Sequence, residues 1–269
     1  MLPSEIGYAR PASLAEALDL LATSDGVRVL AGGQTLVNVM KARAASPEAV
    51  VDLGMLEELK GIELGSDGSL EIGAMTTYTE ILESAEARAR PILGEVCAQI
   101  ADVQVRNRGT IGGNICANDP TNHLPPLLVA LDATMTIASK GGERAVGADD
   151  FFLGVYMTAV APGEVLTKVA IPPGRRDGFA SVTIGVDGTC IVSAAASLEG
   201  GTRIAIGCVD AVPHRATDVE ARLNGDANAA VAGLGATLDP PSDVHAPADY
   251  RRHIAEVVVA RAIEQARSR

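Results

Sequence analysis

The chain has no tryptophan and few other aromatic residues, with four Tyr and three Phe in 269 residues. Basic residues are also in the minority, since 22 Lys and Arg stand against 34 Asp and Glu and give a formal net charge of −12. A nucleic-acid-binding surface needs cations that neutralise phosphates and, for single strands, rings on which bases stack. The composition therefore predicts no nucleic-acid partner.

Cysteine is scarce and scattered. The four cysteines, Cys97, Cys116, Cys190 and Cys208, lie far apart and form no C-x-x-C motif. Zinc sites, iron–sulfur sites and disulfide frameworks all require clustered or regularly spaced cysteines. We expect small buried side chains at these positions and no metal site on this chain.

Long apolar runs are missing as well. No run approaches the roughly 20 residues that a membrane-spanning helix needs. The first residues, Met1 to Glu5, contain neither a basic stretch nor an apolar core typical of a secretory signal. The sequence therefore predicts no transmembrane segment and a cytoplasmic location, with peripheral membrane association through partners left open.

With 47% hydrophobic residues, the chain can bury a substantial core. Apolar residues recur with helical spacing in some segments and alternate or run as in strands in others, which predicts a mixed α and β chain in three parts. Residues 172–178, rich in Pro and Gly, form the best linker candidate. Beyond the linker, three strands in a meander are expected, followed by helices. The expected strands cover residues 27–30, 50–53, 70–73, 134–138, 143–146, 165–171, 179–185, 190–198 and 202–210. The expected helices cover residues 36–43, 76 or 77 to 87, 91–101, 124–131, 215–223 and 247–267.

Two polar glycine loops are the informative sites, Ala31-Gly32-Gly33-Gln34-Thr35 and Gly109-Thr110-Ile111-Gly112-Gly113-Asn114. A diphosphate needs convergent backbone N–H groups without Cβ atoms in the way, and a helix N-terminus adds a favourable dipole. Paired glycines also make ordinary tight turns, as Gly141-Gly142 and Gly200-Gly201 are expected to do. Neither loop fits the P-loop or Rossmann pattern, which argues against a standard nucleoside triphosphatase or NAD enzyme.

The two loops in their context resemble a known family. The first is followed by Met40-Lys41-Ala42-Arg43, and the second is preceded by Val105-Arg106-Asn107-Arg108 and followed by Asp119-Pro120. Together with residues 72–77, 151–158 and 248–251, they resemble the FAD-binding medium subunits of molybdenum hydroxylases. The likeness is greatest to the carbon monoxide dehydrogenase medium chain and its relatives that act on aldehydes and N-heterocycles, and it extends over nearly the whole chain.

The resemblance implies an α+β fold. It consists of a two-subdomain FAD-binding domain of the PCMH or vanillyl-alcohol-oxidase type, followed by a C-terminal domain with a three-stranded antiparallel sheet and helices. The implied parts are an N-terminal FAD-binding subdomain (1–53), a middle FAD-binding subdomain (54–174) and the C-terminal domain (175–269).

The resemblance also implies a non-covalent FAD whose pyrophosphate and ribityl region are held by both loops, with backbone amides of residues 31–35 and 110–114 facing the diphosphate. Asp119 is expected to contact a ribityl or ribose hydroxyl or, alternatively, to cap the helix near Leu124. The cofactor-binding candidates are Ala31, Gly32, Gly33, Gln34, Thr35, Thr110, Ile111, Gly112, Gly113, Asn114 and Asp119, and no residue is expected to be catalytic.

The implied function is electron transfer within a heterotrimer, assembled as a dimer of heterotrimers. A large molybdopterin subunit would oxidise the substrate, and a small subunit with two iron–sulfur clusters would pass electrons to the FAD, which delivers them to an external acceptor. A self-contained flavin oxidase or reductase and a scaffold with a degenerate flavin site remain the alternatives.

Two departures from the family pattern stand out. Many relatives carry an acidic residue where this chain has His123, and their segment after the linker carries charges near the isoalloxazine. Residues 179–190 of this chain, Phe-Ala-Ser-Val-Thr-Ile-Gly-Val-Asp-Gly-Thr-Cys, lack most of those charges. The resemblance therefore implies a different environment for the flavin ring.

Overall fold

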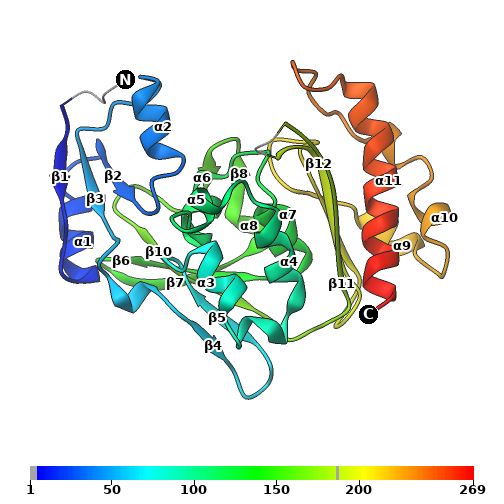
Figure 1. Cartoon of the computed structure of the whole chain (residues 1–269), viewed down its shortest axis with the longest axis horizontal. Coiled ribbons are helices and arrows are strands. Elements are labelled where there is room, and N and C mark those ends of the chain that lie inside the picture. Colours follow the sequence, from blue (N-terminus) through cyan, green and yellow to red (C-terminus); the bar gives the residue numbers. More distant parts are fainter. Residues whose placement is uncertain (1–4, 186–187) are drawn as a thin grey trace.

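The computed structural model describes residues 5–185 and 188–269, and Figure 1 shows three neighbouring parts. The N-terminal part, in blue, carries a parallel sheet. The middle part, in cyan and green, carries an antiparallel sheet with helices packed on it, and the C-terminal part carries another antiparallel sheet backed by a long helix in red. The expected α+β class is confirmed.

Two β–α–β connections build the N-terminal sheet, whose central strand β3 pairs in parallel with β1 and β2. Parallel neighbours need a crossover, which the two helices supply. Apolar side chains of α1 pack with Val51 and Leu53 in one core cluster. The elements are β1 (Gly7–Ala9), α1 (Leu14–Leu21), β2 (Val27–Leu30), α2 (Leu36–Lys41) and β3 (Ala49–Asp52).

The middle sheet is antiparallel throughout, and its strands follow the order β4-β5-β10-β6-β7. A separate two-stranded hairpin, β8–β9, follows α8. The strands are β4 (Ile62–Leu64), β5 (Leu70–Gly73), β6 (Thr134–Ser139), β7 (Gly142–Gly147), β8 (Phe152–Gly154), β9 (Met157–Thr158) and β10 (Val165–Ile171). The hairpin expected at Gly141-Gly142 is thus confirmed.

Helices of the middle part form the largest core with this sheet. Leu93, Ile115 and Leu127 from three different helices are fully buried with Ile72 and Ile137 of the strands, and each such side chain stabilises the fold by about 1.5–3 kcal/mol. The helices are α3 (Tyr78–Glu83), α4 (Pro91–Gln99), α5 (Val103–Arg106), α6 (Ile111–Ala117), α7 (Leu124–Ala130) and α8 (Ala148–Phe151), with 3-10 turns η1 (Glu57–Leu59) and η2 (Ala87–Ala89).

Helix α3 begins where the sequence predicted and ends early. The Thr77 side chain accepts from the Glu80 amide, and the Glu80 carboxylate accepts from the Thr77 amide, which forms a capping box. The helix stops at Glu83 instead of Ala87 because Ser84 is extended and its Oγ accepts from the Ala87 amide, which starts η2.

The C-terminal sheet has four antiparallel strands in the described part of the chain, one more than expected. The additional strand, β14, is only two residues long and occupies the start of the helix predicted over 215–223, which begins at Thr217. The elements are β11 (Asp177–Ile184), β12 (Thr189–Ser197), β13 (Arg203–Gly207), β14 (His214–Arg215), α9 (Thr217–Arg222), α10 (Ala227–Val231), η3 (Leu234–Thr237) and α11 (Ala248–Arg267).

Helix α11 packs closely on the C-terminal sheet. A Cβ atom at Gly178 would lie 1.9 Å from the Ala262 carbonyl oxygen, so only glycine permits this approach. β11 already begins at Asp177, which shortens the connection that was predicted over 172–178. In the stretch 179–190, residues 186–187 lie outside the described residues, and the rest forms most of β11, the adjoining turn and the start of β12.

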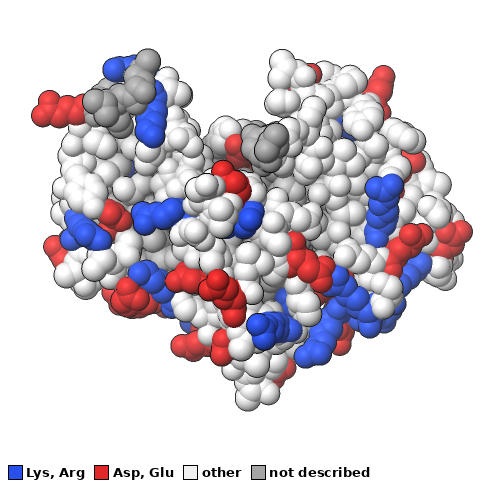
Figure 2. Space-filling view, in the orientation of Figure 1, with Lys and Arg blue, Asp and Glu red and all other residues white. Residues whose placement is uncertain are grey.

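On the face shown in Figure 2, acidic and basic side chains are interspersed. None of the helices in residues 5–185 and 188–269 combines the length and apolar character needed to cross a membrane.

Candidate functional site

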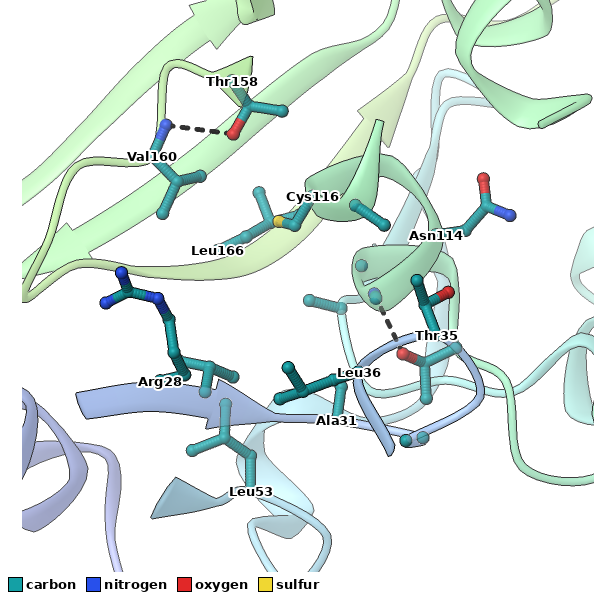
Figure 3. Close-up of a pocket in the computed structure, with 18 of the residues that line it drawn as sticks. Arg28, Ala31, Thr35, Leu36, Leu53, Asn114, Cys116, Thr158, Val160 and Leu166 are labelled. Atoms are coloured by element: carbon teal, nitrogen blue, oxygen red, sulfur yellow. Dashed lines mark hydrogen bonds between the residues drawn. The ribbon is translucent and has the colours of Figure 1, made fainter. Parts of the chain in front are cut away.

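A cavity of about 940 Å³ lies between the N-terminal and middle parts. Its volume is within the usual range of about 300–1,000 Å³ for small-molecule and cofactor sites. Figure 3 shows Arg28, Ala31 and Leu36 on one side of it and Thr158, Val160 and Leu166 on the other, with helix α6 between them. Both glycine segments line this cavity, at Ala31–Thr35 and at Thr110, Gly112, Gly113 and Asn114.

The first glycine segment connects β2 to α2 and offers free backbone donors. Gly33 has a φ of +74°, a left-handed conformation that favours glycine. Within the described residues, the amide N–H groups of residues 32–35 donate to no acceptor. Thr35 stands at the N-cap of α2 without a side-chain capping bond. Four consecutive free amides bordering a cavity form a ready site for an anion.

The second glycine segment uses its amides internally. Ile111 and Gly112 donate to the carbonyl oxygens of Thr76 and Ala74, at 3.0 and 2.8 Å. Gly113 donates to Thr110 Oγ1 at 3.0 Å, which caps α6, and Asn114 donates to the Thr110 carbonyl. The expectation of free amides in this segment is therefore corrected for residues 111–114.

The two segments touch each other, which the sequence could not show. A Cβ atom at Gly32 would lie 1.9 Å from the Arg108 carbonyl oxygen and 2.9 Å from Gly109 Cα. A Cβ atom at Gly113 would lie 3.4 Å from Ala31 Cβ. The glycines therefore allow the two segments to approach each other closely.

Asn114 carries an unsatisfied polar atom at the cavity wall. Its Oδ1 is buried and has no hydrogen-bond partner among the described residues. Burial raises the pKa of the neighbouring Tyr78 phenol, and a hydrogen bond with the Asn114 side chain partly opposes this rise. The buried Oδ1 is therefore an unsatisfied acceptor in a residue that lines the cavity.

Two of the predicted site residues lie outside the cavity. Ile111 is fully buried in the core of the middle part. Asp119 does not border the cavity either, because its carboxylate accepts from the Thr121 amide and hydroxyl and from the Tyr156 phenol, at 2.9, 2.8 and 3.0 Å. Nor does Asp119 cap the next helix, since His123 holds the N-cap position of α7.

Several cavity residues were missed by sequence reasoning. Ile100 and Ala101 follow α4, Tyr156 and Met157 belong to the β8–β9 hairpin, and residues 160–166 lead into β10. The segment 151–158 did contribute to the family resemblance. The positive φ values of Ala101 and Tyr156, at 42° and 57°, have no sequence signature because neither residue is glycine.

The charges that line the cavity are few. Among the described residues, only Arg28 and Glu164 contribute charged side chains. The Arg144 guanidinium, 2.7 Å from the Glu164 carboxylate, lowers the pKa of that group. Arg28 donates to backbone carbonyls and forms no ion pair in the described part of the chain. Its guanidinium charge is therefore not neutralised and makes the cavity positive.

Three of the cysteines are buried as expected, whereas Cys116 is partly exposed. All four are free, and Cys116, which lines the cavity, has a thiol pKa raised to about 12 by burial. Its thiol is therefore neutral at physiological pH, which suits a packing role. No group of three or more metal-ligating side chains occurs within residues 5–185 and 188–269.

His123 is buried against the C-terminal part. Its side chain is 5% exposed, its ring centroid lies 5.5 Å from that of Phe179, and its Nε2 has no partner among the described residues. Burial lowers its pKa to about 4. His123 is therefore neutral and packs on an aromatic ring.

This burial predicts a pH-dependent stability. Between pH 4 and 6.5 the unfolded chain binds a proton at His123 that the folded chain does not, so stability falls as the pH drops through this window. From pH 7 to pH 5, the wild type should lose about 2 kcal/mol more than His123→Gln. Urea-unfolding midpoints of both proteins at the two pH values measure the difference. Parallel pH profiles would contradict a neutral, buried imidazole.

Comparisons with known proteins agree with this geometry. Residues 4–174 match the FAD binding domain in molybdopterin dehydrogenase, and residues 179–266 match the CO dehydrogenase flavoprotein C-terminal domain. The chain is 38% identical to the carbon monoxide dehydrogenase medium chain of Afipia carboxidovorans, over 100% of this chain and 99% of that one. It is 35% identical to the glyceraldehyde dehydrogenase medium chain of Sulfolobus acidocaldarius, over 98% and 99%.

A solved structure also has the same fold as this chain. Carbon monoxide dehydrogenase from Hydrogenophaga pseudoflava, in a form that lacks the Mo-pyranopterin moiety of its cofactor, superimposes with a TM-score of 0.93 and 34% identity. The match covers 100% of this chain and 99% of that one.

Proposed function

Since the chain belongs to the family of FAD-binding medium subunits of molybdenum hydroxylases, we propose that it holds FAD in the cavity between its N-terminal and middle parts. It is an oxidoreductase subunit that passes electrons from the iron–sulfur clusters of a partner subunit through FAD to an external acceptor. The observation that carries this function is the row of free amides at residues 32–35, which faces a cavity of cofactor size.

The residues present fit FAD. The free amides and the positive character contributed by Arg28 suit a diphosphate. The missing Cβ atom at Gly32 lets the first glycine segment lie against the backbone of residues 108–109, which holds these amides in place. The Asn114 side chain, which lines the cavity, can hydrogen-bond to a ribityl or ring group. We assign cofactor contact to residues 31–35 and to Thr110, Gly112, Gly113 and Asn114. Ile111 packs in the core beneath the second glycine segment, and Asp119 lies outside the cavity without contacting the cofactor.

The two ends of the cavity differ in character. Leu21, Val27 and Leu53 line it in the N-terminal part, and Figure 3 places Leu53 across the cavity from Asn114. The apolar end suits the adenine. The opposite end, which includes Asn122 and Tyr156, is polar and more exposed, and the isoalloxazine belongs there because its electron partners must approach it. FAD supplies hydride and single-electron chemistry, and this chain binds and orients it.

The partners follow from the same proposal. The chain works with a large molybdopterin subunit and a small subunit with two iron–sulfur clusters, as a dimer of heterotrimers. The four free thiols support a reducing compartment, and we place the complex in the cytoplasm. The division into residues 1–53, 54–174 and 175–269 is supported by sheet membership, since β3 ends at Asp52, β10 ends at Ile171 and β11 begins at Asp177.

Co-purification of the tagged chain from its native host tests the function. We expect two partner chains, molybdenum, pterin and iron in the complex, with flavin absorption bands that acid or heat releases. A chain that carries FAD alone and is bleached by a substrate without partners would instead be a self-contained oxidase. A colourless chain within an otherwise loaded complex would be a scaffold.

A further inference from the structure

Tyr156 is an exposed aromatic residue in an unusual backbone conformation. It stands in the turn between β8 and β9 with a φ of 57°, which L residues with large side chains seldom adopt. Its side chain is 62% exposed, although it lines the cofactor cavity. Of the seven aromatic residues in the chain, only Tyr78 and Tyr156 border the cavity, and Tyr78 is buried.

Two residues after α6 hold this turn in place. Asn118, itself buried and left-handed with a φ of 41°, donates from Nδ2 to the carbonyl oxygens of Gly154 and Met157, at 2.7 and 3.2 Å. The Tyr156 amide donates to the Asn118 carbonyl at 3.2 Å, and the Tyr156 phenol donates to Asp119 Oδ2 at 3.0 Å. Both the backbone and the tip of the ring are thus fixed.

A strained conformation persists only where its surroundings enforce it, and such positions concentrate at ligand sites. Here the enforced conformation produces no packing benefit within the chain, because the ring stays mostly exposed. The ring is instead presented at the end of the cavity that faces the C-terminal part, where Cys208 Sγ donates to the Pro120 carbonyl close to the Asp119 anchor.

On the basis of the FAD site proposed above, we propose that the Tyr156 ring lies against the isoalloxazine of bound FAD and that Asp119 is a positioning residue that acts through the Tyr156 phenol. The Asp119 carboxylate is then needed to orient the Tyr156 ring, although it does not contact the FAD itself. A flat ring on the isoalloxazine adds apolar and stacking contact.

Protection from chemical modification tests the contact in the wild-type chain. N-acetylimidazole acetylates exposed phenols, and mass spectrometry of peptides measures the rate at each tyrosine with and without FAD. Tyr8 is a matched control, since it is 59% exposed and its phenol also donates to a carboxylate, Asp52, at 2.6 Å, but it does not line the cavity. FAD at about ten times its Kd should slow acetylation of Tyr156 roughly tenfold. Tyr8 should react at an unchanged rate.

Flavin fluorescence supplies a second readout, because a stacked tyrosine quenches it. Tyr156→Leu should make the bound FAD several-fold more fluorescent than in wild type, whereas Tyr156→Phe should leave it quenched. Asp119→Ala should raise the fluorescence of bound FAD, and Asp119→Asn, which keeps an acceptor oxygen, should restore the quenching. A purely structural role for Asp119 would not produce this rescue pattern in the fluorescence of the bound flavin.

The outcomes separate the two proposals. If the wild-type chain binds no FAD, alone or with its partners, the proposed function fails. If it binds FAD and Tyr156 is acetylated at the same rate as without FAD, only the Tyr156 contact is overturned. Unquenched fluorescence in the wild type, equal to that of Tyr156→Leu, would overturn it as well.

Discussion

Replacing Asp177 by alanine is expected to lower the free energy of unfolding by about 3–5 kcal/mol. Asp177 and Arg90 are 1% and 3% exposed and form a two-point ion pair, with Nε to Oδ2 at 2.8 Å and Nη2 to Oδ1 at 2.9 Å. Without the carboxylate, the guanidinium stays buried with only the Pro172 carbonyl and the Ser197 hydroxyl as acceptors. An uncompensated buried charge is among the most destabilising changes a fold can undergo.

The position of this pair adds to its effect. Arg90 precedes α4 in the middle part, whereas Asp177 and Ser197 belong to strands β11 and β12 of the C-terminal sheet. The pair therefore fastens the connection at residues 172–176 and joins the two parts. We expect Asp177→Ala to loosen the C-terminal part from the middle part before the rest of the fold is lost.

Urea unfolding followed by circular dichroism measures the change, and the chain offers a matched control. Lys168 and Glu71 form an ion pair of similar length, 2.9 Å, but their side chains are 41% and 48% exposed. Glu71→Ala should cost only about 0–1 kcal/mol. The double variant Arg90→Met/Asp177→Leu should recover most of the loss, because it removes both charges. A cost for Asp177→Ala no larger than that of Glu71→Ala would contradict the buried-pair argument.

Local signals in the sequence predicted local structure well. The β-branched run before Gly32, the apolar spacing after Thr35 and a capping threonine at residue 76 or 77 act over a few positions, and the structure confirms strand, turn and helix there. The two-residue strand β14 carries too few residues for a pattern, and only its pairing with β13 defines it. Its absence from the prediction is therefore a limit of local patterns.

The sequence identified the segments that line the candidate site but not the contacts between them. Both glycine segments were singled out, yet only the tertiary structure shows that Gly32 lies against Arg108, or that the amides after Thr110 are already used. Asp119 was predicted, from the family resemblance, to contact a ribityl or ribose hydroxyl or to cap the helix near Leu124. In the structure its carboxylate oxygens accept hydrogen bonds from Thr121 and Tyr156 instead. Tyr156 lies in the β8–β9 hairpin, 37 residues further along the chain, so no local pattern predicts this contact.

Gly32→Ala is expected to abolish or severely weaken FAD binding. The added Cβ atom would lie 1.9 Å from a backbone oxygen, Arg108 O, far inside any contact distance. A backbone atom cannot rotate away as a side chain can, so the two glycine segments must separate. Gly32 has no positive φ, so alanine causes no backbone strain there. The loss of FAD binding would therefore come from the steric clash between the two glycine segments.

The separation would displace the free amides of residues 32–35 from the cavity wall formed by α6. Loss of this alignment should cost at least about 3 kcal/mol in FAD binding, roughly a 150-fold rise in Kd. Fluorescence titration with FAD measures it, and the flavin content of the purified complex gives an independent value.

Gly147→Ala serves as the matched control, because Gly147 has an ordinary φ of −66° and a Cβ atom there would meet nothing within 4 Å. This variant should bind FAD as the wild type does, and both variants should keep the circular dichroism of the folded chain. Wild-type affinity in Gly32→Ala would show that the two segments need not touch for the cofactor to bind. FAD would then be held by the first segment alone, through the four amides that donate to nothing else in the described part of the chain.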